Sequence, residues 1–184
     1  MKPIRIVIDM DEVMADTYAK FNDLYTARFG NRLTPEEYHG KKIYEMEGAM
    51  ELRDHLNDPG FFRDLKVMPD AQEVVRELYD EYEVFIVTAA TEFRHSFLDK
   101  YEWLEEHFPF IHWSRIVFCG DKSIVHGDYM IDDKVSNLEP FNGEGILFTA
   151  SHNVNHDHFH RVHTWLDVRE FFAARRRSRL AMEA

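Results

Sequence analysis

Five short apolar runs, separated by stretches with helical periodicity, constrain the fold of this chain more than any other feature. The first run, Ile4–Ile8, is rich in β-branched residues and leads directly into two aspartates. Runs of this kind are typical of strands buried on both faces of a parallel sheet. Their alternation with helices predicts βαβ units and an α/β fold with a doubly wound sheet. The other four predicted strands are Val84–Thr88, Arg115–Cys119, Tyr129–Asp133 and Gly145–Thr149.

The interval between the first two predicted strands is longer than a single helix requires. We predict a helix over 14–29, a short helix opened by Thr34-Pro35, and a weaker, mostly helical pattern over 40–58. We therefore expect a core of residues 1–13 and 67–184, with a small helical cap, residues 14–66, inserted after the first strand. Further helices are expected from Pro69-Asp70 onward, over 93–107 and over 165–177.

Length and composition limit the class of protein. The chain has 184 residues, 45% of them apolar, which suits one compact domain. No run approaches the roughly 20 apolar residues of a membrane span, so no membrane partner is expected. The single cysteine, Cys119, is expected to be a small buried apolar residue and excludes an internal disulfide. With no room for a signal peptide before the first strand, this favours a cytoplasmic location.

The net charge of −12 is the second limit on function. It argues against a nucleic-acid polymer as partner. It would also repel a small anionic substrate, so a phosphate site in this chain needs local positive groups or a metal ion.

Groups suited to phosphate and metal chemistry follow four of the five predicted strands. Each is weak evidence alone, because a threonine often simply fills a strand, a lysine is often a surface charge, and paired aspartates often cap a helix. Since the carboxyl ends of parallel strands meet at one edge of a sheet, their common placement favours a shared site. These residues are Asp9 and Asp11, Thr88, Lys122, and Asp132 and Asp133.

The residue types fit a division of labour around Mg²⁺, which prefers oxygen ligands. We predict that Asp9, the backbone carbonyl of Asp11, and Asp132 bind Mg²⁺. Asp9 is the candidate nucleophile, and Asp11 the candidate acid/base that protonates the leaving oxygen and then activates water.

The remaining candidates would bind the phosphate. The Thr88 hydroxyl and the backbone N–H of Ala89 can hold phosphate oxygens, and Lys122 can neutralise the charge that develops. We expect Asp133 to orient a metal-bound water or Lys122 from behind the metal ligands.

The stretches DMD, VTAAT, GDKS and MIDD resemble the four motifs of the haloacid dehalogenase (HAD) superfamily of aspartyl-phosphate phosphatases. The stretches DMDEVMADT, DPGFFRDLKVMPDA, GDKSIVHGDYMIDDK and LFTASHN narrow the likeness to the 5'(3')-deoxyribonucleotidase family, over nearly the whole chain. The resemblance implies a Rossmann-like core, a small helical cap, Mg²⁺, and hydrolysis of deoxyribonucleoside monophosphates. It also implies Asp9 as nucleophile, Asp11 as acid/base, Thr88 and Lys122 as phosphate ligands and Asp132 as metal ligand. A homodimer is compatible with the resemblance, although the sequence shows no interface signature.

Three departures from the family pattern concern the substrate. Glu12 stands where the superfamily usually has glycine, and two alanines follow Thr88 where members can carry a serine. The tryptophans that vertebrate members place around the base have no counterpart in 40–55. Tyr44, Phe61 and Phe62 are the available aromatics, and each is also a candidate core residue. The preferred base, and the choice between 5'- and 3'-phosphates, stay open.

Three further groups of basic residues stand out in the sequence. Arg94, His95 and Lys100 are candidates for phosphate or sugar contacts. Arg175–Arg177 fits a solvated helix end. Five histidines near the carboxyl end have a spacing that could suit a transition metal, but we favour a polar surface loop. They are His152, His156, His158, His160 and His163.

Two alternative functions remain. A phosphatase of the same chemistry could act on a sugar phosphate or another small ester. A phospho-accepting receiver domain also combines aspartates, a threonine and a lysine on a doubly wound sheet. A receiver, however, has its phosphorylated aspartate on the third strand. Asp11 would also hydrolyse a phosphate that a receiver must retain.

Overall fold

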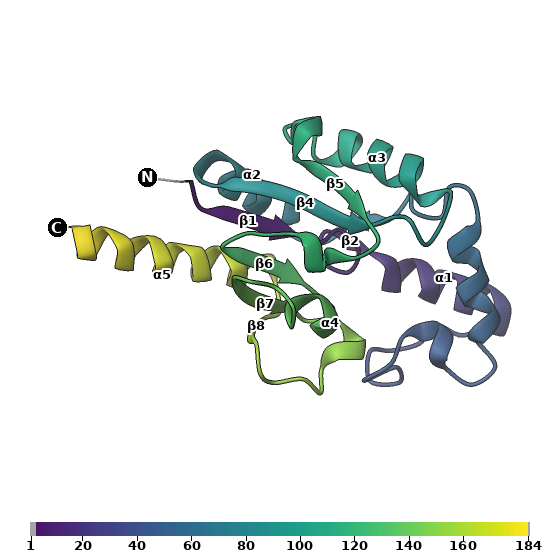
Figure 1. Ribbon diagram of the computed structural model, residues 1–184. Helices are drawn as coiled ribbons and strands as arrows, with labels where there is room; N and C mark the ends of the chain where they lie inside the picture. Colours follow the sequence, from purple (N-terminus) through teal and green to yellow (C-terminus); the bar gives the residue numbers. More distant parts are fainter. Residues whose placement is uncertain (1–2, 184) are drawn as a thin grey trace.

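Within residues 3–183, which the computed structural model describes, six parallel strands form the central sheet (Figure 1). The sheet order is β5-β4-β1-β6-β7-β8, so the first strand lies near its middle. The predicted α/β, doubly wound fold is confirmed. The strands of this sheet are β1 (Arg5–Ile8), β4 (Glu83–Ala89), β5 (Ile116–Cys119), β6 (Tyr129–Asp132), β7 (Glu144–Phe148) and β8 (His160–Val162).

Apolar side chains on both faces of the sheet explain why the strands read as continuous apolar runs. Side chains alternate along a strand. Ile6 and Ile8 belong to the larger apolar cluster on one face, and Val7 belongs to a second cluster on the other. The helices α2 (Ala71–Glu81), α3 (Ser96–His107) and α5 (Trp165–Glu183) contribute to the larger cluster. The short helix α4 (Val135–Leu138) contributes to the second.

The helix boundaries follow local signals. The Asp16 carboxylate accepts a hydrogen bond from the Ala19 N–H at 2.8 Å and caps α1 (Thr17–Phe29). Gly30, at φ 83°, ends the helix in the left-handed conformation that glycine adopts easily. The helix ends at the predicted residue and begins three residues later than predicted. The helix α3 begins three residues later than predicted, and α5 extends beyond the predicted 177 and projects past the sheet (Figure 1).

The segment between β1 and β4 differs more from prediction. Two 3-10 helices, η1 (Ile43–Glu45) and η2 (Met50–Asn57), replace the mostly helical pattern over 40–58. The predicted helix at Thr34-Pro35 is wrong, since residues 35–40 form turns and Gly40 leaves helical geometry at φ 76°. A short antiparallel pair, β2 (Ala15–Asp16) with β3 (Lys66–Val67), joins the two ends of the segment and was not predicted.

The inserted segment shares the apolar cluster of the sheet. Phe21, Leu52 and Phe61 belong to the same cluster as Trp103 of α3. The Trp103 indole N–H also donates to the Leu65 carbonyl at 2.8 Å. The division into a core of 1–13 and 67–184 and a cap of 14–66 stays a prediction, because packing is continuous across it. Among the described residues, no helix is long and apolar enough to cross a bilayer.

Candidate active site

Two strand ends and one lysine form the buried centre of the site. Asp9 directly follows β1, its N–H donates to the Ile131 carbonyl at 2.9 Å, and Asp132 is the last residue of β6. Lys122 begins the 3-10 helix η4 (Lys122–Ile124), just after β5. Its ammonium contacts Asp9 Oδ1 at 2.7 Å and Asp132 Oδ2 at 2.6 Å. The predicted edge of the sheet therefore brings these three residues together.

The charges in this centre are strongly coupled. Burial raises the pKa of the Asp9 carboxyl, but the charge and hydrogen bond of Lys122, together with the charges of Lys134 and Lys100, outweigh burial and hold that pKa below its usual value. Burial and the neighbouring Asp9 raise the pKa of Asp132. Burial lowers the pKa of Lys122, but its two carboxylate partners prevail and raise it. Asp9 is thus held as a carboxylate. Asp132 accepts further hydrogen bonds from the Asn137 amide at 3.0 Å and the Lys134 N–H at 2.8 Å.

A second buried lysine, Lys100 of α3, serves Asp11 and Thr88. Its ammonium donates to Asp11 Oδ2 at 2.6 Å, to the Thr88 hydroxyl at 2.9 Å and to the Ala89 carbonyl at 3.2 Å. Thr88 and Lys100 are completely buried. Sequence reasoning had named Lys100 only among candidates for substrate contacts, because the sequence does not show that a mid-helix lysine reaches the sheet edge. Arg94 and His95, the other two, are exposed.

Asp133 lies closer to the centre than we expected. One carboxylate oxygen from each of Asp9, Asp132 and Asp133 lies within 4.8 Å of the others. Burial and Asp132 raise the pKa of Asp133 well above its usual value. Its backbone carbonyl accepts from the Asn153 amide at 2.8 Å, but its buried Oδ1 has no hydrogen-bond partner. Asp11 Oδ1 is likewise buried without a partner.

These features fit a divalent cation. Carboxylates this close repel one another, and unsatisfied buried oxygens are costly unless a donor or cation completes them. Oxygen donors without sulfur or imidazole suit a hard cation. We refer to Asp9, Asp11, Asp132 and Asp133 below as the strand-end aspartates.

Glu12 forms the turn that separates the strand-end aspartates from the inserted segment. It has a left-handed φ of 62°, which is uncommon for a residue other than glycine. The Thr17 hydroxyl donates to its carboxylate. Burial, followed by the charges of Asp133, Asp16 and Asp11, raises its pKa well above the usual value. A glycine, which is usual here in the superfamily, would adopt this φ without strain. Glu12 accepts the strain, and its carboxylate links the turn to α1 through the Thr17 hydroxyl.

A pocket opens between the sheet edge and the inserted segment, beside two of the strand-end aspartates, Asp11 and Asp133. Asp11, Glu12, Asp133 and Lys134 line its inner side. Phe61, one of the three candidate aromatics, is buried among other aromatic rings instead. The outer side is lined largely by the inserted segment, including Tyr18, Phe21, Lys42, Tyr44, Arg53 and Phe62.

Only one residue of the histidine-rich stretch lies at this site. His152 contacts the Tyr18 hydroxyl through Nδ1 at 3.1 Å and lies 3.4 Å from Asp133 through Nε2. Burial and the nearby charges of Lys42 and Lys134 lower its pKa to about 4. His156, His158 and His163 are exposed, as expected for a surface loop.

The surface-loop prediction is wrong for residues 160–162, which form the edge strand β8. Among residues 3–183, the histidines join no group with metal-ligand spacing. Arg175 and Arg176 are exposed and pair with Glu144 and Glu81. Cys119 is buried, as predicted.

The fold is shared with a solved hydrolase. A solved HAD-family hydrolase of Deinococcus radiodurans superposes with a TM-score of 0.58, covering 95% of this chain and 97% of that one, at 13% identity. The sheet and its flanking helices thus have the HAD-like fold.

Sequence comparison narrows the class to a family. The family described as "5' nucleotidase, deoxy (Pyrimidine), cytosolic type C protein" matches residues 2–178. A Staphylococcus epidermidis relative is 49% identical over 170 residues, covering 91% of this chain and 95% of the relative. The 5'(3')-deoxyribonucleotidase of Bacillus subtilis is 40% identical over 166 residues, covering 89% and 95%. The chain therefore belongs to this nucleotidase family, and it is a hydrolase of the phosphatase type.

Proposed function

We propose that this protein hydrolyses deoxyribonucleoside monophosphates to nucleoside and phosphate, through a phosphorylated Asp9. The observation that carries the proposal is the ionised Asp9 beside Lys122, with Asp11, two residues further along the chain, lining the adjacent pocket. Family membership and the name of the Bacillus subtilis relative support the substrate class.

Asp9 is placed to act as the nucleophile. Its Oδ1 is held by Lys122, which leaves Oδ2 to attack phosphorus. The low pKa keeps Asp9 ionised at neutral pH, as a nucleophile must be. The attack forms a bond between Asp9 and phosphorus and breaks the bond to the leaving nucleoside oxygen. Lys122 stabilises the negative charge on the phosphoryl oxygens during the transfer.

Asp11 is the proposed acid/base. Asp11 Oδ1 has no partner, while Oδ2 is fixed by Lys100, so the side chain is oriented with one oxygen available. Protonated Asp11 donates its proton to the leaving oxygen, and as a carboxylate it then removes a proton from the attacking water. Lys100 also positions the Thr88 hydroxyl, and the proposed phosphate contacts are this hydroxyl and the Ala89 N–H.

Mg²⁺ is the proposed cofactor, held by Asp9, Asp132 and the Asp11 carbonyl. Asp133 lies close enough to contribute through its own oxygen or to orient a bound water. When bound, Mg²⁺ neutralises the carboxylates and the phosphate and lowers the energy of the charged transition state.

The outer side of the pocket is the proposed nucleoside site. Tyr44 and Phe62 present aromatic rings there, and the inserted segment would act as a small cap that shields the reaction from water. The structure suits a small ester and does not itself select a base.

A substrate panel tests the proposal. Phosphate release is measured with Mg²⁺ for deoxyribonucleoside 5'- and 3'-monophosphates, the matching ribonucleotides and several sugar phosphates. We expect the highest kcat/KM for deoxyribonucleotides. Equal or higher kcat/KM for a sugar phosphate would overturn the substrate assignment and favour the alternative phosphatase.

A further inference from the structure

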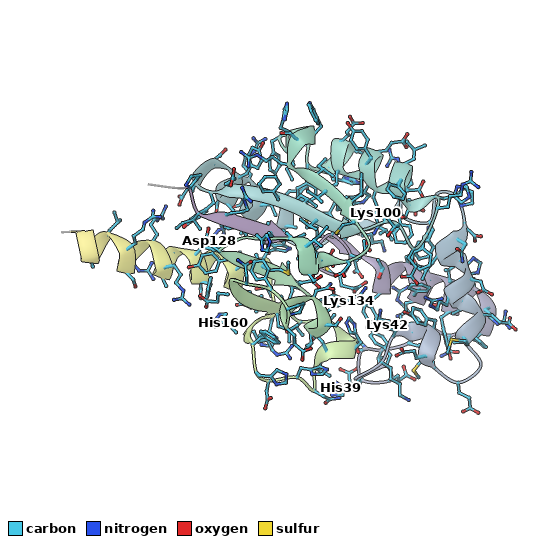
Figure 2. The ribbon with its side chains drawn as sticks, in the orientation of Figure 1. His39, Lys42, Lys100, Asp128, Lys134 and His160 are labelled. Carbon is cyan, nitrogen blue, oxygen red and sulfur yellow. The ribbon has the colours of Figure 1, made fainter. Side chains whose placement is uncertain are left out.

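Two lysines that line the pocket form no ion pair with any described carboxylate. Lys42 comes from the inserted segment and Lys134 from the loop after β6 (Figure 2). Both line the same pocket. Among residues 3–183, no carboxylate lies within ion-pair distance of either ammonium. Arg53, the third cation that lines this pocket, is already paired with Glu92 at 2.7 Å.

The position of Lys42 is fixed by its surroundings. Its own N–H donates to the Glu45 carboxylate at 2.8 Å, and the preceding Lys41 carbonyl accepts from the Tyr18 hydroxyl at 3.1 Å. The Gly40 N–H donates to the Ser151 carbonyl at 3.0 Å, which ties this turn to the core. Lys42 is half-buried, whereas its neighbour Lys41 is exposed and does not line the pocket. A lysine held in this way differs from an ordinary surface charge.

The charge of the site indicates what these lysines bind. The four strand-end aspartates face two buried lysines, Lys100 and Lys122. One divalent cation would bring the formal sum of these six groups to zero, and the Glu12 carboxyl on the inner side of the pocket adds at most one further negative charge. A phosphate monoester then adds close to two negative charges, and an uncompensated charge in a partly buried pocket is costly. Lys42 and Lys134 are the two cations left to compensate it.

We infer that Lys42 and Lys134 form an anion-recognition pair that binds the phosphoryl oxygens of the substrate from the pocket side. This inference rests on the proposed function and adds a role for the inserted segment. Because Lys42 belongs to that segment and Lys134 to the core, a bound phosphate joins the two. The phosphoryl group thus adds a link between the inserted segment and the core that a neutral nucleoside does not supply.

Binding of inorganic phosphate tests the inference without requiring turnover. The Kd of phosphate is measured by calorimetry with Mg²⁺ present, for the unchanged protein and for the variants Lys42→Gln, Lys134→Gln and Lys41→Gln. Loss of one charged hydrogen bond to an anion corresponds to roughly a tenfold to hundredfold weaker Kd. We expect such a loss for Lys42→Gln and Lys134→Gln, partial recovery for Lys42→Arg, and no change for the matched control Lys41→Gln.

Hydrogen exchange supplies a second measurement that a purely structural role of Lys42 would not affect. Phosphate should slow exchange of the amides in 41–46 in the unchanged protein and in Lys41→Gln. It should not do so in Lys42→Gln. Thermal unfolding of each variant confirms that it is folded before binding is compared.

The outcomes separate this inference from the proposed function. Phosphate binding by Lys42→Gln and Lys134→Gln that equals the unchanged protein would overturn the inference, even if deoxyribonucleotides are hydrolysed. Weaker phosphate binding by both variants would support it, even if the substrate panel selects another ester.

Discussion

The two ends of the central sheet carry ionic clusters of opposite character. At the amino ends of the strands, Glu83 lies between Arg5 at 2.8 Å and Arg115 at 2.7 Å, and the Arg5 N–H donates to Asp128. Acids and bases balance there, and the arginines are about one-third exposed. At the carboxyl ends, the four strand-end aspartates outnumber the two buried lysines.

The amino-end cluster serves stability, whereas the carboxyl-end cluster serves function. In the amino-end cluster each charge is paired and partly solvated, so the cluster needs no ligand. The carboxyl-end cluster keeps Asp11 Oδ1 and Asp133 Oδ1 buried and unsatisfied, which costs free energy in the unliganded protein. Such a cost is typical of sites completed by a ligand. The following predictions test this comparison, from the largest expected effect to the smallest.

Asp9→Asn should remove activity almost completely. The amide is nearly isosteric but a far poorer nucleophile, so we expect kcat to fall by at least about 10⁴-fold. Initial rates on the best deoxyribonucleotide measure this, with thermal unfolding to confirm the fold. Residual turnover within tenfold of the unchanged protein would show that another group attacks phosphorus.

Lys122→Ala should impair both activity and stability. Removing a charge that stabilises the transition state costs about 10²- to 10³-fold in kcat. The variant also leaves Asp9 and Asp132 buried without their shared partner, which should lower the free energy of unfolding by about 3 kcal/mol. Denaturant unfolding in chelator measures the second effect. A variant as stable as the unchanged protein would contradict the proposed role of this ion pair.

Asp133→Asn should raise the stability of the protein in chelator and lower its affinity for Mg²⁺. It removes a buried carboxyl that stands beside Asp132, so in chelator we expect the free energy of unfolding to rise by about 1 kcal/mol. Affinity for Mg²⁺, measured by calorimetry, should fall. If the variant is less stable in chelator, the carboxyl-end cluster does not lower the free energy of unfolding as proposed.

Glu83→Gln should have the smallest effect, confined to stability. Hydrogen bonds from Arg115 and Arg5 hold the pKa of Glu83 below its usual value of 4.5. A lowered pKa means that this stabilisation is present above about pH 4.5 and is lost as the pH falls further. We expect a loss of about 1 kcal/mol at pH 7 and a smaller loss at pH 4, with kcat unchanged. A loss of equal size at both pH values would contradict the ionic origin.

Sequence alone predicted the parts of the molecule whose signals are local. The apolar runs and the acids that follow them identify β1, β6 and the shared edge. Lys100 shows where such reasoning ends, because its contacts with Asp11 and Thr88 depend on how α3 packs. The edge strand β8 escaped prediction since only Val162 of its three residues is buried. In the inserted segment, tertiary packing overrode the helix signal of Thr34-Pro35.

The central claim, that Asp9 takes up the phosphoryl group, is tested most directly by trapping it there. In Asp11→Asn, loss of the group that activates water should let the phosphorylated intermediate accumulate. Mixing this variant with Mg²⁺ and a deoxyribonucleotide, quenching in acid and sequencing peptides by mass spectrometry locates the group. We predict one phosphoryl group on Asp9. Phosphate release with an unmodified Asp9, or phosphorylation of a different residue, would contradict the account.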